Sequence, residues 1–240
     1  NMELSGRSTI AAQGLYTSSS TKMHELGQKF ETPDGRTFRY VKAGELLVAG
    51  DFYQTAVHSS TYVSQAVASA SAIGVKTITV TTGAAFTANQ FAGGYAIVSA
   101  GTGIGQMFVI QSHPAADSGA SCVVTLLEPI RVALDTTSTV TTIKNPFDSV
   151  VKWAVTQTGS SAGAAIYPVA SGEYGWLQTG GAGAALSDNV ATAAETTGIS
   201  PSTTTAGAIT KAVTTQETIG GAMQVVTVSA AVGAIRLNLD

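Results

Sequence analysis

The sequence contains few charged residues. Only 11% of its 240 residues are Asp, Glu, Lys or Arg, whereas a typical soluble domain has about 25%. Its polarity comes mainly from Thr, Ser, Gln and Asn, and a monomer with so few charges has little electrostatic protection against self-association. We therefore expect partners in a permanent assembly to cover much of the surface.

The sequence also lacks a concentration of basic residues. Twelve Lys and Arg face fifteen Asp and Glu, which gives a net charge of −3 and an isoelectric point near 5.6. The basic residues are scattered, and only Arg36 and Arg39 lie close together. Because nucleic-acid binding needs a clustered positive surface, we expect no nucleic-acid partner.

Cysteine and long apolar runs are scarce as well. The single cysteine, Cys122, cannot form an intrachain disulfide and sits in the strand-like run 121–127, where we expect it to be a small buried side chain. No run of about 18 apolar residues predicts a membrane span, and the N-terminal residues lack the apolar core of a signal peptide. We expect synthesis in a reducing cytoplasm and no membrane partner.

Motifs of catalysis and metal binding are missing from the sequence. His24, His58 and His113 lie on separate segments without ligand spacing, and the run after the last of these predicts a surface or turn position for it. No nucleophile elbow, zinc-protease motif or phosphate-binding loop occurs, although distant residues can still converge into a triad. We expect no enzyme activity, no catalytic residue, no metal and no cofactor.

The stretch Gly101-x-Gly103-x-Gly105 has two interpretations. Alternating glycines suggest a phosphate-binding loop, but such a loop needs the spacing G-x-G-x-x-G and a following helix. Here residues 106–110 read Gln-Met-Phe-Val-Ile, which is typical of a strand. We predict a turn between two strands, in which the glycines supply positive φ.

Abundant Thr and Val and scarce Lys and Glu predict an all-β fold of β-barrel or sandwich domains. Regularly spaced strands are expected in the middle of the chain, at 76–81, 95–99, 106–112, 122–127 and 140–143. A short strand is also expected at 46–48. Beyond residue 150 the texture becomes rich in Gly and Ala, and the stretch 187–195 fits either a short helix or a strand.

The first 29 residues predict an extended N-terminal arm. They show no sustained hydrophobic period and include the polar run 18–21. Such a terminus is either disordered in isolation or laid along a neighbouring molecule. Trp176 also has two interpretations, because Trp is common in interface hot spots and equally at home in a strand core.

A set of turn and strand signatures gives the sequence a family resemblance. They occur in order along residues 30–240: Asp34-Gly35-Arg36, Phe38-Arg39-Tyr40, Ala43-Gly44, Gly50, Gln54, Asn89, Gly93-Gly94, the turn at 101–105 leading to Ile110, Leu126, Pro129, Ala133-Leu134, Asn145-Pro146-Phe147, Gly175-Trp176-Leu177-Gln178 with Gly180, Ala206-Gly207, and Ile219-Gly220 with Ala222. In this order they resemble the capsid decoration, or cement, proteins of tailed bacteriophages.

The resemblance implies a virion structural protein on the outer surface of an icosahedral phage head. Such a protein is commonly a homotrimer that bridges neighbouring major capsid protein subunits, and it would be made in the host cytoplasm. The resemblance further implies a discontinuous base domain, 30–72 plus 149–240, with an inserted small barrel or sandwich at 73–148. No catalytic residue is carried over.

From the arm and these signatures we expect a capsid or trimer interface. It would include Leu4, Ile10, Leu15, Tyr16, Arg36, Arg39 and Trp176.

Two other functions remain open at this point. A head- or tail-fibre component that binds host surface carbohydrate would share the Thr-, Gly- and Ala-rich β texture, although no fixed-period repeat is evident. A β-rich hydrolase of surface glycans would need a pair of carboxylates that sequence alone does not position.

Overall fold

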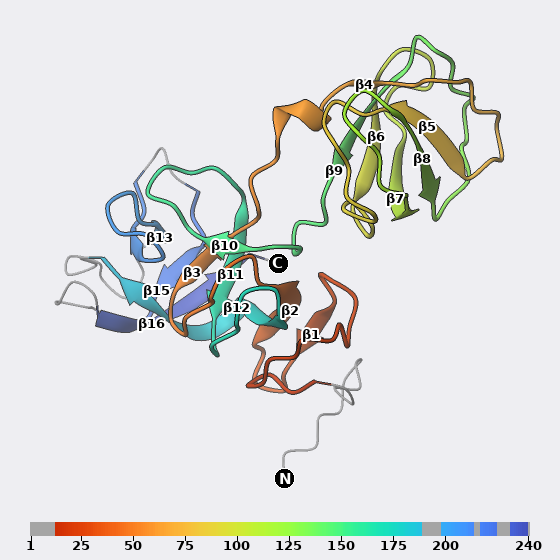
Figure 1. Ribbon diagram of the computed structural model, residues 1–240. Helices are drawn as coiled ribbons and strands as arrows, with labels where there is room; N and C mark the ends of the chain where they lie inside the picture. Colours follow the sequence, from red (N-terminus) through yellow and green to blue (C-terminus); the bar gives the residue numbers. More distant parts are fainter. Residues whose placement is uncertain (1–12, 189–197, 214–216, 225–230, 240) are drawn as a thin grey trace. The chain divides into compact units, whose positions relative to one another are not determined.

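The computed structural model describes residues 13–188, 198–213, 217–224 and 231–239 (Figure 1). These residues form an all-β protein, as predicted, with one 3-10 turn, η1 (Ser60–Tyr62). No helix among them is long and apolar enough to cross a membrane. The strands are β1 (Lys29–Glu31), β2 (Thr37–Lys42), β3 (Phe52–Gln54), β4 (Gln65–Ala66), β5 (Thr77–Thr81), β6 (Tyr95–Ala100), β7 (Met107–Ser112), β8 (Ser121–Leu126), β9 (Thr139–Ile143), β10 (Val151–Lys152), β11 (Ser161–Ala165), β12 (Tyr174–Ser187), β13 (Gly198–Pro201), β14 (Ile209–Lys211), β15 (Gly220–Ala222) and β16 (Ala231–Asn238).

The chain folds into two compact units. The barrel unit is continuous, His58–Asn145, and the base unit combines Asn1–Val57 with Pro146–Asp240. The first boundary therefore lies fifteen residues before the expected position 73. The reason is that β4 pairs with β9 and Val67 is buried in the core of the barrel unit, so residues 58–72 belong to that unit.

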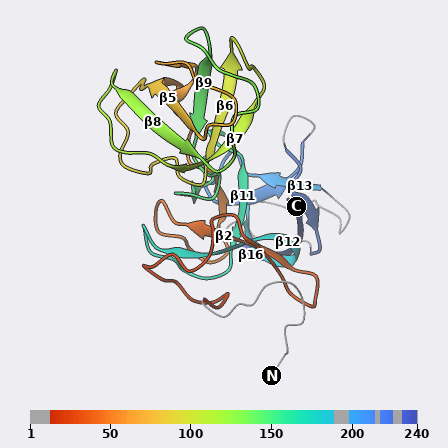
Figure 2. The same cartoon turned by 90° about the vertical axis from the view of Figure 1, so that its right-hand side faces the viewer.

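The barrel unit is a six-stranded antiparallel sheet that closes on itself (Figure 2). Its order is β4-β9-β6-β7-β8-β5, and the residues after β4 return to β5 through a bridge between Val67 and Val80. Within each strand alternate side chains point inward, so that Ile78 and Val80 on β5 are buried while Thr77 is exposed. This alternation is the pattern that made these strands predictable.

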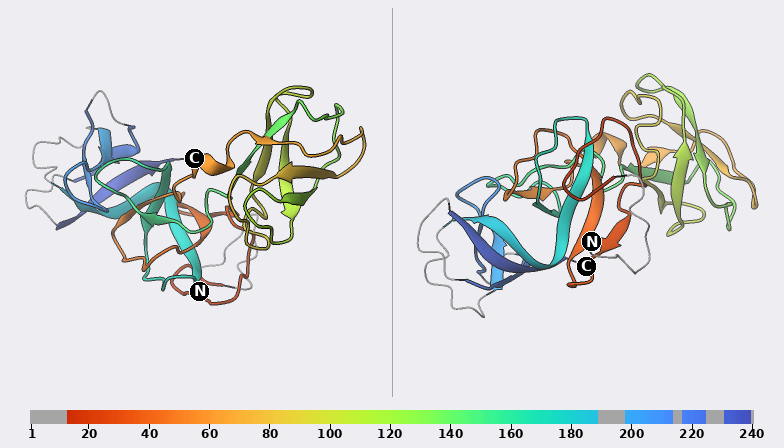
Figure 3. Two further views of the ribbon diagram at one scale, coloured as in Figure 1. Left: turned by 45° about the horizontal axis from the view of Figure 1, so that its top comes forward. Right: turned by 90° about the horizontal axis from the view of Figure 1, so that it is seen from below.

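The base unit is organised by β12, a strand of fourteen residues (Figure 3). Its first half lies between β2 and β11, and its second half, from Gly180 to Ser187, pairs with β16. Ser187 also pairs with Ile209 of β14, and β14-β13-β15 lead back to β16. The second half of β12 is therefore part of a closed ring of five strands.

The first half of β12 is buried on both faces. Trp176 points into an aromatic cluster with Phe30, Phe38 and Tyr40, whereas the next residue, Leu177, packs on the opposite face with other apolar side chains. Because neighbouring side chains on a strand point to opposite faces, burial of both requires a layer on each side of the sheet.

Two segments of the chain connect the units, one after β3 and one before β10, and these two strands are paired. β3 ends at Gln54 and β10 begins at Val151, and these two residues are antiparallel partners. The chain therefore leaves and re-enters the base unit from adjacent strands of one sheet.

Two predictions in the base unit had different outcomes. Residues 46–48 are not a strand: only Leu47 makes an isolated bridge, with Val169, while Leu46 and Val48 are 57% and 42% exposed. A hydrogen bond from the Asp51 amide to the Val48 carbonyl instead makes a turn there.

The stretch 187–195 is described only in part. Ser187 ends β12 and residue 188 follows it, and the remainder lies outside the described residues.

Candidate functional site

Residues 13–28 form a strap across the base unit of their own chain. The amide of Gln13 donates to the carbonyls of Thr17 and Tyr174, each at 2.9 Å, and Ser19 makes a β-bridge with Tyr174. The described part of the predicted arm is therefore packed on its own fold, which corrects the expectation of a free extension. Leu4 and Ile10 lie outside the described residues.

The hydroxyl of Tyr40 adds a further attachment of the strap to the core. The hydroxyl of Tyr40 donates to Oε1 of Gln13 at 2.6 Å and accepts from the amide of Met23 at 3.1 Å. Burial raises the pKa of Tyr40, so the hydroxyl keeps the proton that it donates. Two points of the strap, ten residues apart in sequence, thus depend on one atom.

Beneath the strap lies the aromatic cluster of Phe30, Phe38, Tyr40 and Trp176. Leu15 packs against it from the strap, and the Trp176 ring lies 5.0 Å from that of Tyr40 at an edge-on angle, a favourable aromatic geometry. Trp176 is only 2% exposed. Of its two interpretations, the core aromatic is correct, and its side chain is not a surface anchor.

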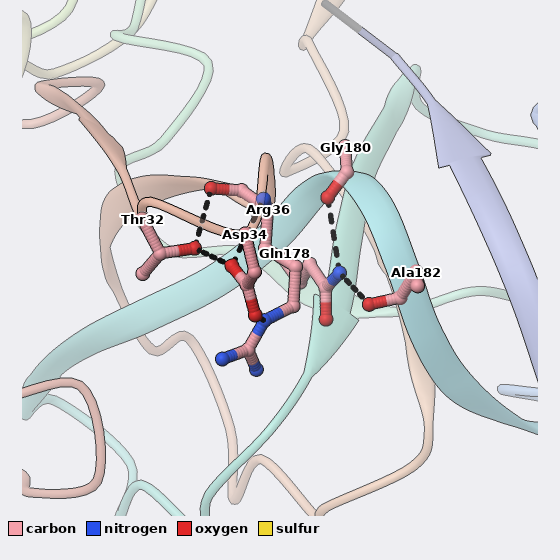
Figure 4. Close-up of polar contacts among 6 residues, drawn as sticks. All are labelled: Thr32, Asp34, Arg36, Gln178, Gly180 and Ala182. Atoms are coloured by element: carbon pink, nitrogen blue, oxygen red, sulfur yellow. Dashed lines mark hydrogen bonds and ion pairs between the residues drawn. The ribbon is translucent and has the colours of Figure 1, made fainter.

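The exposed part of the predicted interface is a small polar group at the turn before β2. Tyr16 is 54% exposed and hydrogen-bonds the side chain of Arg36. Nε of Arg36 lies 2.7 Å from Oδ2 of Asp34 (Figure 4). These contacts raise the pKa of Arg36, Tyr16 contributing most. A hydrogen bond from Thr32, followed by the contacts with Arg36, lowers the pKa of Asp34.

Because the Asp34 carboxylate is exposed, solvent screens this ion pair, and the pair adds little to the stability of the fold. The structure therefore brings Leu15, Tyr16 and Arg36 together at the strap. Only the latter two present polar groups to solvent in a fixed arrangement.

The side chain of Arg39 lies on the face of β2 opposite to that of Arg36. Its guanidinium donates to the carbonyl of Gly27 at 2.9 Å and lies 5.9 Å from the ring centre of Phe147. The guanidinium of Arg36 lies instead near the ring of Phe38, at 5.7 Å. The two arginines that are neighbours in the sequence do not form one basic site, because the alternation along a strand separates them.

Gln178, which the sequence singled out only as part of the family resemblance, organises the bend of β12 next to this turn. Its amide nitrogen donates to the carbonyls of Gly180 and Ala182 at 3.0 and 2.8 Å (Figure 4). Gly181 has φ of +80°, and a Cβ there would lie 2.7 Å from the carbonyl oxygen of Gly35. The bend at 180–182 therefore fits against the turn at 34–36 only because residue 181 is glycine.

The glycine stretch 101–105 is a turn between β6 and β7, as predicted. Gly101, Gly103 and Gly105 all have positive φ, between +76° and +88°. The amides of Ile104, Gly105 and Gln106 donate to carbonyls within the same hairpin. Those N–H groups are therefore engaged inside the protein, unlike those of a phosphate-binding loop, which face the ligand.

The three histidines occupy different environments. His24 packs against Tyr40 and Trp176, and His58 is exposed. His113 is only 4% exposed, so its predicted surface position is wrong: the ring packs between Phe86 and Phe91 in the barrel unit. Among the described residues, no group of three or more His, Cys, Asp or Glu is placed to hold a metal ion.

Replacement of Tyr40 by Phe tests the attachment of the strap. Tyr40→Phe leaves the Gln13 oxygen and the Met23 amide without this partner, so we expect the free energy of unfolding to fall by about 1–3 kcal/mol. Tyr167→Phe, at a 38% exposed site, is the matched control and is expected to change it by less than about 0.5 kcal/mol. Chemical denaturation measures both, and equal effects would contradict the role of the hydroxyl.

Two glycines of the 101–105 turn give a matched pair. In Gly101→Ala the new Cβ would lie 2.2 Å from the carbonyl oxygen of Thr137, whereas at Gly105 it would meet nothing within 4 Å. Both substitutions carry the positive-φ cost of about 1–2 kcal/mol, and the first adds a backbone clash. We expect Gly101→Ala to lower the thermal midpoint clearly more than Gly105→Ala, and similar midpoints would show that the turn relaxes freely.

Asp135 makes the same turn sensitive to acid. Hydrogen bonds from Thr102 and Thr137 lower its pKa from 3.8 to about 2. Because the folded value lies below the unfolded one, this stabilisation is present above about pH 4 and is lost as the pH falls toward 2. We expect Asp135→Asn to lower the urea midpoint at pH 5 and to approach wild type near pH 2.5. Asp117→Asn, at an exposed site, is the control; parallel wild-type and Asp135→Asn curves over this range would refute the effect.

Comparisons with known proteins add no relative. Neither a scan against protein-family models nor searches of curated proteins and of solved structures found a match to this chain. A functional assignment therefore has to come from the residues and their geometry.

Proposed function

We propose that the chain is a virion structural protein that decorates an icosahedral phage head and bridges neighbouring major capsid protein subunits. The observation that carries the proposal is the interrupted base unit, whose halves Asn1–Val57 and Pro146–Asp240 enclose a separate β-barrel. This order of segments is the one that the resemblance to decoration proteins implies, although the barrel unit begins fifteen residues and ends three residues earlier than expected.

Two glycines of that resemblance are also required by the conformation of the backbone. Gly35 and Gly101 both have positive φ, and a side chain at Gly101 would meet the carbonyl oxygen of Thr137. These residues are therefore needed by the fold. The resemblance thus rests on positions that the architecture constrains.

The surface of the barrel unit favours an assembled protein. Its 88 residues include only three basic and three acidic side chains: Lys76, Arg131, Lys144, Asp117, Glu128 and Asp135. Exposed apolar side chains are present as well, among them Ile104 at 66% and Met107 at 48%. A surface with few charges and with exposed apolar groups is suited to permanent contact with protein.

Trimeric assembly would make modest contacts sufficient. Three equivalent patches that face a symmetric shell bind one after another, and the second and third contacts form at high effective concentration. Each patch then needs only about 800 Å² per partner. We include the pair Tyr16 and Arg36 in such a patch, since the strap that carries Tyr16 continues directly from residues 1–12.

Binding to undecorated heads tests the proposal. Purified full-length protein is mixed with heads, the heads are pelleted, and the bound copies are counted. We expect saturation at a multiple of three copies per capsid face. Folded protein that fails to co-sediment would contradict the proposal, and a glycan array would then test the carbohydrate-binding fibre alternative.

A truncation before Gln13 tests the N-terminal residues separately. Removal of residues 1–12 spares the strap, whereas a cut at residue 28 would strip Leu15 and Leu26 from the aromatic cluster. We expect removal of 1–12 to weaken head binding at least tenfold, about 1.4 kcal/mol, without a change in circular dichroism. Arg131→Ala, which removes an exposed pair with Glu128, is the control; undiminished binding of the truncated protein would remove these residues from the interface.

A further inference from the structure

The imidazole of His113 is buried with both ring nitrogens against backbone groups. Nδ1 lies 2.9 Å from the carbonyl oxygen of Pro114, and Nε2 lies 3.0 Å from the amide nitrogen of Phe91. A carbonyl oxygen only accepts and an amide N–H only donates. The ring must therefore carry a proton on Nδ1 and none on Nε2, which is the neutral form.

The segment that His113 holds is part of the barrel core. Asn89 exchanges two further hydrogen bonds with the backbone of His113, at 3.0 and 3.1 Å, and has a positive φ of 59°. Phe86 and Phe91, on either side of it, are each 2% exposed. Residues 89–91 are thus attached to the end of β7 through the backbone and the ring of this one histidine.

The titratable groups around the ring do not supply an acceptor for a second ring N–H, which protonation of Nε2 would create. Tyr62 packs on Phe86 and Phe91, and the thiol of Cys122 lies 3.7 Å from the same Pro114 carbonyl. Burial raises the pKa of that thiol, and phenols and thiols stay neutral between pH 5 and 7. Asp117 follows in the next turn, where its backbone carbonyl accepts from Thr82.

We propose that His113 is an acid-sensitive latch that attaches residues 89–91 to the barrel unit only while its ring is neutral. Protonation puts a second N–H on Nε2, which then faces the Phe91 N–H. Two donors cannot share a hydrogen bond, and the added charge is buried without an anion. The proton is therefore taken up by an opened state, in which residues 89–91 leave the end of β7.

Amide hydrogen exchange of the full-length protein between pH 7.5 and 5.0 tests the latch. Exchange rates corrected for intrinsic exchange report the population of the opened state. This state binds one more proton than the closed one. The population of the opened state should therefore rise as the pH falls, by up to tenfold per pH unit. We expect this loss of protection in peptides covering 86–94, and no comparable loss in β12 and β16 of the base unit.

Two variants assign the effect. His113→Gln retains an acceptor for the Phe91 amide but cannot titrate, so protection of 86–94 should become independent of pH. His58→Gln, at the exposed histidine of the same unit, should behave like wild type. Retention of the wild-type slope in His113→Gln, or flat protection down to pH 5.0 in wild type, would overturn the proposal.

A measurement on wild type covers the case in which His113→Gln does not fold. Nitrogen-15 NMR of the imidazoles reports which ring nitrogen carries the proton. We expect Nδ1–H with a bare Nε2 at pH 7, and a change on acidification together with the amide signals of Asn89 and Phe91. A proton on Nε2 at pH 7 would overturn the assignment.

Discussion

The base unit depends on the bend of β12 at Gly180 and Gly181. At this point the strand leaves β2, where Gly180 is opposite Thr37, and joins β16, where the same residue is opposite Asn238. The change of partner is possible because Gly181 adopts φ of +80° and because the amide of Gln178 donates to two carbonyls around the bend. Without this bend one strand could not belong both to the flat sheet and to the closed ring.

The surroundings of the bend link it to the N-terminal part of the chain. The backbone at Gly35 and Arg36 lies directly against Gly181, and β2 carries Phe38 and Tyr40 from there into the aromatic cluster. The strap then covers that cluster through the hydroxyl of Tyr40. The exposed Tyr16 and the half-buried Arg36 are thus positioned by packing that begins at the half-buried Gly181, which is why a surface group on a segment before the first strand has fixed partners.

The sequence predicted the barrel strands well and the base unit less well. Strands of the barrel alternate buried and exposed side chains, and that period is visible in stretches such as residues 77–81. In the first half of β12 both faces are buried, and the second half is mostly glycine and alanine, so no period marks the length of the strand or its bend. The boundary at 58 was missed because β4 has only two residues, too few to show a pattern.

The candidate site was predictable in part, for similar reasons. The 101–105 turn followed from its flanking strands, whereas the sequence left Trp176 open between a core and an interface position, and the structure buries it. The roles of Gln13, Gln178 and His113 depend on partners far away in sequence or on backbone groups, and a side chain's identity alone carries no signal of such contacts.

The pairing of β3 with β10 has an evolutionary consequence. Because Gln54 and Val151 are partners on adjacent strands, the two chain ends that receive the barrel are close together whatever lies between them. Insertion of a domain is tolerated where its termini are adjacent and the host sheet is already complete. The base unit can therefore accept a different module, or a short hairpin loop, between these two residues without a change in the fold that holds it.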